Sequence, residues 1–198
     1  MKNIGSPLTE SDARSLSAGD SITLTGKIFT ARDEAHIHAL SFNEKGLAMP
    51  FDLKGAAVFH CGPIMRKVGD GWEVVAAGPT TSSRMNSLEP DFIRKFGARA
   101  IIGKGGMSKD TIDAMAEFGC VYLALTGGAA VLAARGIVNV AGVHWFELGM
   151  PEAVWELDVK DFGPLTVAID SHGNSLYEDV GLDVQRNLPA IRKKLGID

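Results

Sequence analysis

Two loops of the sequence combine glycine with hydroxyl and cationic side chains. The first, GPTTSSRM (78–85), places Thr80 near its start and Arg84 four positions later, with no histidine, cysteine or carboxylate in the run. The second, IIGKGGMSKD (101–110), has Lys104 among glycines and Ser108 where a helix N-cap would fall. Loops that follow the strands of an open α/β sheet meet at its carboxyl edge, where ligands bind. Side by side, these loops would bind a small carboxylate or phosphate.

A third cation follows an apolar run, in the word TARDEAH. Arg32 could hold a carboxylate through two parallel hydrogen bonds from its planar guanidinium. Taken by itself, the run favours the alternative that Arg32 pairs with Asp33 or Glu34 on the surface, where an ion pair contributes little. Both glycine loops could also be ordinary turns, with Thr80 as a cap and Lys104 in solvent. Spacing alone leaves both interpretations open.

Nucleotide-binding templates do not match the second loop. A P-loop around Gly103 and Lys104 requires glycine at position 98 and serine or threonine at position 105, but the chain has Ala98 and Gly105 there. A dinucleotide fingerprint that begins at Gly103 fails at its third glycine, because Ser108 occupies that position. The sequence therefore disfavours both kinds of nucleotide site.

Metal ligands are scarce in the sequence. Two cysteines, Cys61 and Cys120, lie outside any CxxC or Cys/His spacing, and an iron-sulfur cluster needs three or four thiolates. We expect both to be small buried residues. The HIH run would point His36 and His38 to different sides of a helix, so solvated or core-edge histidines are favoured over a metal site. The chain alone is not expected to bind a metal.

Strands and helices alternate through the middle of the chain. Alternating, β-branched residues predict a strand over 20–31, and a helical pattern follows over 32–42. Strand, glycine turn and helix then recur three times between positions 72 and 136, which indicates parallel βαβ units. The remaining predicted strands are 56–62, 72–78, 98–103 and 120–126, and the predicted helices are 80–97 with a break before Pro90, 108–119 and 127–136.

The C-terminal part returns to strands and ends in a helix. Residues 153–179 predict two strands joined by a turn at Gly163 and Pro164, and residues 183–196 predict a helix. The 198 residues, 45% of them hydrophobic, suffice to bury the core of one domain. We therefore predict a single α/β domain over 1–198 with a parallel βαβ middle and strand-rich ends, in which 180–198 form a C-terminal helix or tail.

Charge and hydropathy narrow the class of partners. Twenty lysines and arginines against 24 aspartates and glutamates give a net charge of −4, and the basic residues are scattered. Neither nucleic acid nor an anionic membrane is therefore an expected partner. No run approaches the roughly 18 apolar residues of a membrane span, and the N-terminus lacks the apolar core of a secretory signal. We expect a cytoplasmic protein.

Several uncommon words of the sequence occur together in one known family. ARDEAH, HCGPI, GPTTSSRM, GKGGM, GGAAVLAA, ELGMPEAVW and DSHGN follow one another as in the C-terminal half of class I fumarate hydratases and in the β subunit of L(+)-tartrate dehydratase. The chain resembles this family from about residue 5 to about residue 178. The resemblance implies a swivelling β/β/α domain that closes over a [4Fe-4S] cluster, which a separate α subunit or an N-terminal domain carries.

The resemblance also implies a role for each candidate residue. Arg32 matches the arginine of the family's ARD motif, Thr80 the first threonine of GPTT, Arg84 the arginine that follows, and Lys104 the lysine of the next loop. By this resemblance the two arginines and the lysine bind substrate carboxylates, and Thr80 is the general acid. The cluster cysteines and the catalytic base belong to the half that this chain lacks. GKGGM departs from the longer enzymes and is closer to the two-subunit and tartrate-type proteins.

The implied activity is that of an iron-sulfur hydro-lyase of the tricarboxylic acid cycle, which hydrates fumarate to (S)-malate. Dehydration of L(+)-tartrate to oxaloacetate is the alternative. We expect activity only together with an α subunit, in an αβ or α2β2 complex, and self-association of the isolated chain stays open. Two readings from other classes remain, namely a stand-alone anion- or nucleotide-binding domain and a regulatory subunit with a vestigial site.

Overall fold

The main sheet has seven strands in the order β1-β2-β3-β6-β7-β9-β8 in the computed structural model, which describes residues 1–197. Neighbouring strands from β1 to β7 in this order run parallel. Because β9 pairs antiparallel with both β7 and β2, the strands β2-β3-β6-β7-β9 close into a ring. The bounds are β1 Lys2–Ser6, β2 Ser21–Thr30, β3 Ala57–Phe59, β6 Ala100–Gly103, β7 Val121–Ala124, β8 Ile137–His144 and β9 Val154–Ile169.

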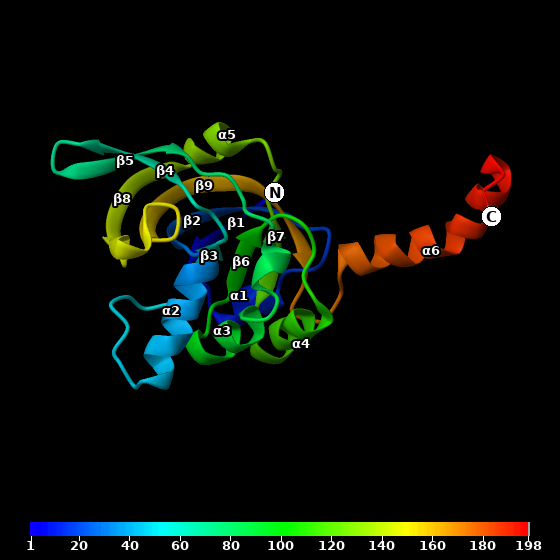
Figure 1. The fold of residues 1–198 in the computed structure, drawn as a ribbon, viewed down its shortest axis with the longest axis horizontal. Helices are drawn as coiled ribbons and strands as arrows, with labels where there is room; N and C mark the ends of the chain where they lie inside the picture. Colours follow the sequence, from blue (N-terminus) through cyan, green and yellow to red (C-terminus); the bar gives the residue numbers. More distant parts are fainter. Residues whose placement is uncertain (198) are drawn as a thin grey trace.

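Helices cover the outside of this ring. In Figure 1, α2, α3 and α4 lie together on one side, and α5 lies on the other side beside the antiparallel hairpin of β4 (Ile64–Val68) and β5 (Gly71–Ala76). The helical bounds are α1 Glu10–Arg14, α2 Asp33–Glu44, α3 Glu89–Phe96, α4 Lys109–Phe118, α5 Ala130–Ala134 and α6 Leu176–Leu195, with 3-10 turns η1 Ser82–Met85 and η2 Phe146–Leu148.

The parallel strands are buried on both faces. In β3, Ala57 and Phe59 belong to the apolar cluster within the ring, whereas Val58 between them packs in the cluster beneath α2, α3 and α4. The same alternation recurs in β6 and β7. Burial on both faces is typical of parallel strands covered by helices, and it explains the nearly continuous apolar runs. The packing fixes the carboxyl ends of β2, β3 and β6 at one edge of the sheet.

The structure confirms a mixed α/β fold with parallel strands and corrects two predicted connections. The strand predicted at 72–78 is not part of the parallel series, because β5 turns back on β4 through Gly69 and Asp70 and pairs with it locally. The two strands predicted over 153–179 are one strand, β9, because Gly163 and Pro164 lie at a register shift against β2 rather than in a turn. The sequence analysis also did not predict β1 and β8. The swivelling motion stays a prediction.

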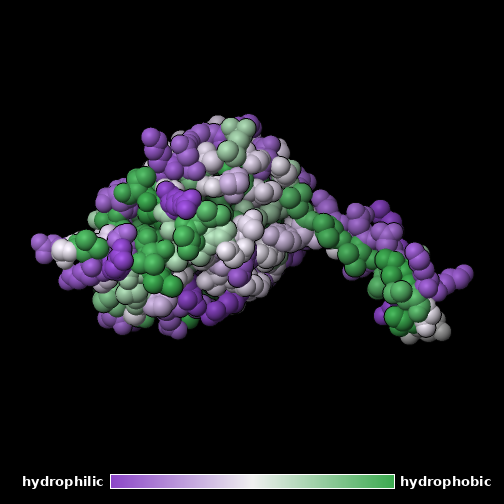
Figure 2. Space-filling model, turned by 90° about the horizontal axis from the view of Figure 1, so that it is seen from above, coloured by the Kyte–Doolittle hydropathy of each residue, from purple (hydrophilic) through white to green (hydrophobic). Residues whose placement is uncertain are grey.

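The last helix, α6, projects away from the body of the protein (Figure 1). It begins at Leu176, ahead of the helix or tail predicted over 180–198, whose final residue lies outside the described residues. None of the residues of α6 is buried. Figure 2 shows apolar side chains along one side of this helix and polar ones along the other. Among residues 1–197, no helix is both long and apolar enough to cross a membrane.

Candidate functional site

The four predicted site residues lie where parallel strands end. Arg32 follows β2, and Lys104 comes directly after β6. The amide of Thr80 donates a hydrogen bond of 2.6 Å to the carbonyl of His60, which follows β3. An isolated parallel bridge then pairs Thr81 with Lys104. The segment that follows the β4–β5 hairpin, which contains Thr80 and Thr81, therefore lies between the ends of β3 and β6.

The two glycine loops are neighbours, although the first follows the antiparallel β4–β5 hairpin and not a strand of the parallel sheet. The amide of Lys104 donates to the carbonyl of Thr80 at 3.4 Å, and the amide of Ser82 donates to the carbonyl of Lys104 at 3.0 Å. A Cβ added at Gly127, in the loop after β7, would lie 3.5 Å from Lys104 Cδ. The aliphatic part of the Lys104 side chain therefore lies beside the loop after β7, and Lys104 as a whole is exposed to solvent.

Each arginine of the site is held by a carboxylate from another segment. Arg84 Nε and Nη2 lie 3.1 and 3.0 Å from the carboxylate oxygens of Asp33. Arg32 Nε lies 3.2 Å from Glu152 Oε1, and the glycine at position 62 leaves room for its guanidinium. Glu152 is therefore the partner of Arg32, in place of the Asp33 or Glu34 pairing considered from the sequence. Asp33, which follows Arg32 in the chain, pairs instead with Arg84.

Neither candidate hydroxyl acts as a helix cap. The turn after Thr80 is the short 3-10 helix η1, which has no side-chain cap. Ser108 occupies the N-cap position of α4, but its hydroxyl faces Thr111 Oγ1 at 3.2 Å and not the helix amides. Within residues 1–197, the hydroxyl of Thr80 makes no hydrogen bond, although Thr80 is only partly exposed. It is free to meet a ligand.

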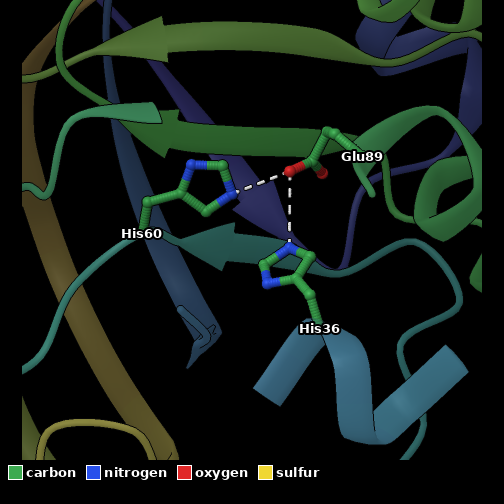
Figure 3. Close-up of side chains that lie close together, drawn as sticks. All are labelled: His36, His60 and Glu89. Atoms are coloured by element: carbon green, nitrogen blue, oxygen red, sulfur yellow. Dashed lines mark ion pairs between the residues drawn. The ribbon is translucent and has the colours of Figure 1, made fainter. Parts of the chain in front are cut away.

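Three buried ionisable residues lie behind these loops (Figure 3). His60 Nε2 lies 2.9 Å and His36 Nε2 lies 3.3 Å from the same oxygen of Glu89, and all three side chains are 0% exposed. They come from α2, from the end of β3 and from α3. His38 lies on another part of α2, against Phe42. The HIH run therefore splits between two environments, as a helix requires, but His36 is fully buried, neither solvated nor at the edge of the core.

The carboxylate sets the charges of this cluster. Burial acts to raise the pKa of Glu89, but the imidazoles of His60 and His36 outweigh burial and lower it to about 2. Burial acts to lower the pKa of His36, but the charge of Glu89 outweighs burial and the net shift is upward. For His60 burial prevails, and its pKa is lowered. Glu89 is thus ionised, and of the two histidines His36 is the one whose environment favours the protonated form.

Sequence reasoning did not single out His60 or Glu89. His60 follows an apolar strand, and Glu89 opens a helix, where an acidic residue usually lies in solvent beside the positive end of the helix dipole. The only signal was the histidine inside the apolar word AAVFHCG. The expectation for the cysteines is confirmed, since both are buried and burial raises the pKa of Cys61 to about 12 and also raises that of Cys120.

The fold is an α/β domain in which the segments that carry Arg32, Thr80, Arg84 and Lys104 lie at one edge of the sheet, with each arginine paired to a carboxylate. The family described as fumarase C-terminus matches residues 2–180. The chain belongs to this family.

Named relatives of the chain fall into two groups. A Methanocaldococcus jannaschii protein provisionally named L(+)-tartrate dehydratase subunit beta is 50% identical over 182 residues, which are 91% of this chain and 93% of that protein. The L(+)-tartrate dehydratase subunit beta of Escherichia coli K12 is 42% identical over 193 residues, or 97% and 94% of the two chains. A Geobacillus stearothermophilus protein provisionally named fumarate hydratase class I is 47% identical over 175 residues, 88% of this chain but 33% of that protein.

Proposed function

We propose that this chain is the β subunit of a hydro-lyase that adds water reversibly to fumarate to give (S)-malate. The observation that carries the proposal is the meeting of Arg32, Thr80, Arg84 and Lys104 at one edge of the sheet, through direct contacts between their segments. A four-carbon dianion needs cations at both ends and a hydroxyl or water near its double bond. This edge offers three cations and one hydroxyl without a hydrogen-bond partner within the described residues.

Arg32, Arg84 and Lys104 would bind and orient the two carboxylates. An arginine presents five donors, so Arg84 can keep Asp33 and still donate to a substrate. Asp33 and Glu152 then hold the guanidinium groups in place before the substrate arrives. Fixing a substrate in this way lowers the barrier because the orientation is set before the reaction.

Thr80 would hold or relay the proton that is added to the double bond. A threonine hydroxyl is a weak acid, so its alkoxide must be stabilised as it forms. The 3-10 turn η1 is too short to supply a strong dipole, which leaves the cation of Lys104 as the stabilising group. The backbone bond between Lys104 and Thr80 holds their two segments together for this role.

The proposal assigns the iron-sulfur cluster to a partner α subunit. The chain has two cysteines, both buried, and they do not fit the ligand set of such a cluster. When bound in the partner, a [4Fe-4S] cluster with an open iron supplies a Lewis acid for the substrate. The relatives of matching length are named as β subunits, which supports a partner of this kind.

The test is an anaerobic reconstitution of the chain with a cluster-loaded α subunit from the same source. Arg84→Lys and Lys104→Ala should each lower kcat/KM for fumarate at least tenfold, or about 1.4 kcal/mol of transition-state stabilisation. Arg94→Lys and Lys109→Ala are matched controls, because both residues pair with local carboxylates elsewhere on the surface. Values within about twofold of wild type for Arg84→Lys or Lys104→Ala would contradict the assignment, since that difference is only about 0.4 kcal/mol.

Dehydration of L(+)-tartrate to oxaloacetate is the second candidate function. Two relatives that match this chain over nearly their whole length carry the tartrate dehydratase name. The same complex should therefore be assayed with fumarate, malate and L(+)-tartrate in parallel, and the largest kcat/KM assigns the substrate. Tight binding of AMP by the isolated chain in calorimetry, without activity of the complex, would instead favour a stand-alone nucleotide-binding domain.

A further inference from the structure

A continuous chain of buried polar side chains runs beneath the candidate site. His36 and His60 both contact Glu89, and His60 Nδ1 lies 2.9 Å from the hydroxyl of Ser82. The hydroxyl of Tyr122 donates to the same Ser82 oxygen at 2.9 Å. All five residues are 0% exposed. We call them the buried relay.

The partners of the buried relay fix its protons. The carbonyl of Arg32 can only accept, so the bond of 2.8 Å to His36 Nδ1 requires a proton on that nitrogen. Nε2 of His36 and of His60 lie 3.3 and 2.9 Å from Glu89 Oε2 in ion-pair contacts that lack hydrogen-bond geometry. Because an ionised carboxylate can only accept, we assign a proton to each Nε2, which makes His36 an imidazolium that balances the charge of Glu89.

The same assignment of protons makes His60 neutral. Its Nε2 proton points to Glu89, which leaves Nδ1 to accept from the Ser82 hydroxyl. Tyr122 then donates to Ser82, and Ser82 donates to His60. Both hydroxyl protons in this series therefore point in the direction of Glu89. The directions of the pKa shifts of His36 and His60 agree with this assignment.

The buried relay touches the main chain of three site residues. His36 binds the carbonyl of Arg32. The carbonyl of His60 accepts from the amide of Thr80, and the amide of Ser82 donates to the carbonyl of Lys104. Each contact fixes the backbone from which a functional side chain projects. A change in the charge of Glu89 thus reaches all three through its ion pairs with the two histidines and the hydrogen bonds that follow them.

We propose that Glu89 is a positioning residue for the site, holding Arg32, Thr80 and Lys104 in register through the His36–Glu89–His60 cluster. The inference rests on the proposed function for its effect on activity, and on geometry alone for its effect on the backbone. The two ion-pair contacts converge on Glu89 Oε2, and Glu89 Oε1 has no hydrogen-bond partner among residues 1–197, so the charge of Glu89 is what joins the two histidines.

A bound metal is the competing account of the same three residues. Their nearest ligand atoms lie within 4.8 Å of one another, and both histidines have their other nitrogen held by a second group. A structural zinc site, however, takes four ligands, and this cluster offers three with no exposed position for a fourth. The proton assignment accounts for the cluster without a metal, and metal content is measured as part of the test.

The first measurement uses the full-length chain without a partner. Nitrogen NMR of its imidazoles at pH 7.5 should show His36 with both nitrogens protonated and His60 neutral with the proton on Nε2. In Glu89→Gln, His36 should lose its charge, and the amides of Thr80 and Ser82 should exchange with solvent at least tenfold faster. Asp91→Asn is the control, because Asp91 lies exposed on the same helix and, among residues 1–197, pairs only with Arg94. It should leave both readouts unchanged.

Tyr122→Phe keeps the experiment decisive if Glu89→Gln does not fold. It removes one hydroxyl and no volume from the ring, and the Ser82 amide should then exchange at least threefold faster, with Asp91→Asn again unchanged. A neutral His36 in the wild-type chain, one equivalent of zinc that is lost in Glu89→Gln, or unchanged exchange in both variants would overturn the proposal.

Activity provides the second measurement. In the reconstituted complex, Glu89→Gln should lower kcat/KM at least tenfold at a temperature where the variant is fully folded, and Glu89→Asp should recover part of the loss. An unchanged kcat/KM in folded Glu89→Gln would reduce Glu89 to a stability role and overturn the proposal. An inactive wild-type complex would count against the proposed function alone, because the NMR and exchange results on the isolated chain stand without it.

Discussion

Gly103 allows a direct test of how the loop at Lys104 packs on the sheet. It is the last residue of β6, and a Cβ at this position would overlap Ser82 Oγ and lie 2.9 Å from Tyr122 Oη. Ser82 cannot move without loss, because its hydroxyl bonds to both His60 and Tyr122 at 2.9 Å. Gly103→Ala must therefore break both bonds.

The cost follows from those two bonds. Each hydrogen bond contributes about 1 kcal/mol net, and a buried polar group that is left unsatisfied costs about 1–3 kcal/mol more. We expect Gly103→Ala to destabilise the chain by about 3 kcal/mol, taking the lower part of that range. For a domain of this size, the melting temperature should fall by about 6–12 °C.

Thermal and urea unfolding of the full chain measure this effect. Gly181→Ala is the matched control, because a Cβ there meets nothing within 4 Å in the exposed helix α6. In a helix, alanine is favoured over glycine by up to about 1 kcal/mol, so this control should be neutral or slightly stabilising.

A double variant tests the cause. Ser82→Ala already loses both hydrogen bonds, so adding it to Gly103→Ala should cost little further, since the removed Oγ no longer overlaps the new methyl group. Simple addition of the two single effects, or a Gly103→Ala chain that melts within about 2 °C of wild type, which is less than about 1 kcal/mol, would refute the packing argument.

Three further predictions concern charge and exposure. The pKa of Glu89 is lowered from 4.5 to about 2 by the neighbouring histidines against the opposing effect of burial, so its ion pair stabilises the fold above pH 4.5 and is lost as the pH falls toward 2. Urea titrations from pH 5 to about 2.5 should therefore show a steeper loss of unfolding free energy in wild type than in Glu89→Gln, and parallel curves would contradict this. Cys61 and Cys120 should react with a thiol reagent at pH 8 at less than about a hundredth of their rate in urea, because the thiols are buried and protonated, and prompt reaction of the folded chain would argue otherwise. Asp33→Asn should raise KM for the diacid severalfold by releasing Arg84, with a melting temperature close to wild type because the pair is partly solvated, and an unchanged KM would show that Arg84 needs no such support.

The sequence predicted the parts of the fold that depend on local pattern. The strands that became β2, β6 and β7 and the helices that became α2 and α4 follow from apolar periodicity within single segments. The hairpin of β4 and β5 was missed because an apolar run reads the same whether it joins a parallel sheet or turns back locally. The glycine and aspartate at 69 and 70 were the available signal for the turn.

The candidate site divides in the same way. Arg32, Thr80, Arg84 and Lys104 were proposed from loop position and from sequence motifs that match a known family, and their roles stay predictions. The position argument holds for the loops after β2 and β6, but the loop with Thr80 and Arg84 follows an antiparallel hairpin and is held at the same edge by its backbone bond to His60. Their partners could not be named in advance. Glu152 lies 120 positions from Arg32, and Glu89 lies 29 positions from His60, as the printed numbering shows. Such pairs arise from tertiary packing, which brings together residues whose local context looks unremarkable.

The projecting helix α6 has a consequence for how the isolated chain behaves in solution. A compact chain of 198 residues would have a radius of gyration of about 16 Å. The 20 residues of α6 extend about 30 Å at 1.5 Å per residue, outside that compact body. A single copy should therefore elute from a sizing column ahead of its 21.0 kDa mass. Early elution alone therefore does not show association, and a direct mass measurement is needed to distinguish an elongated single copy from a dimer.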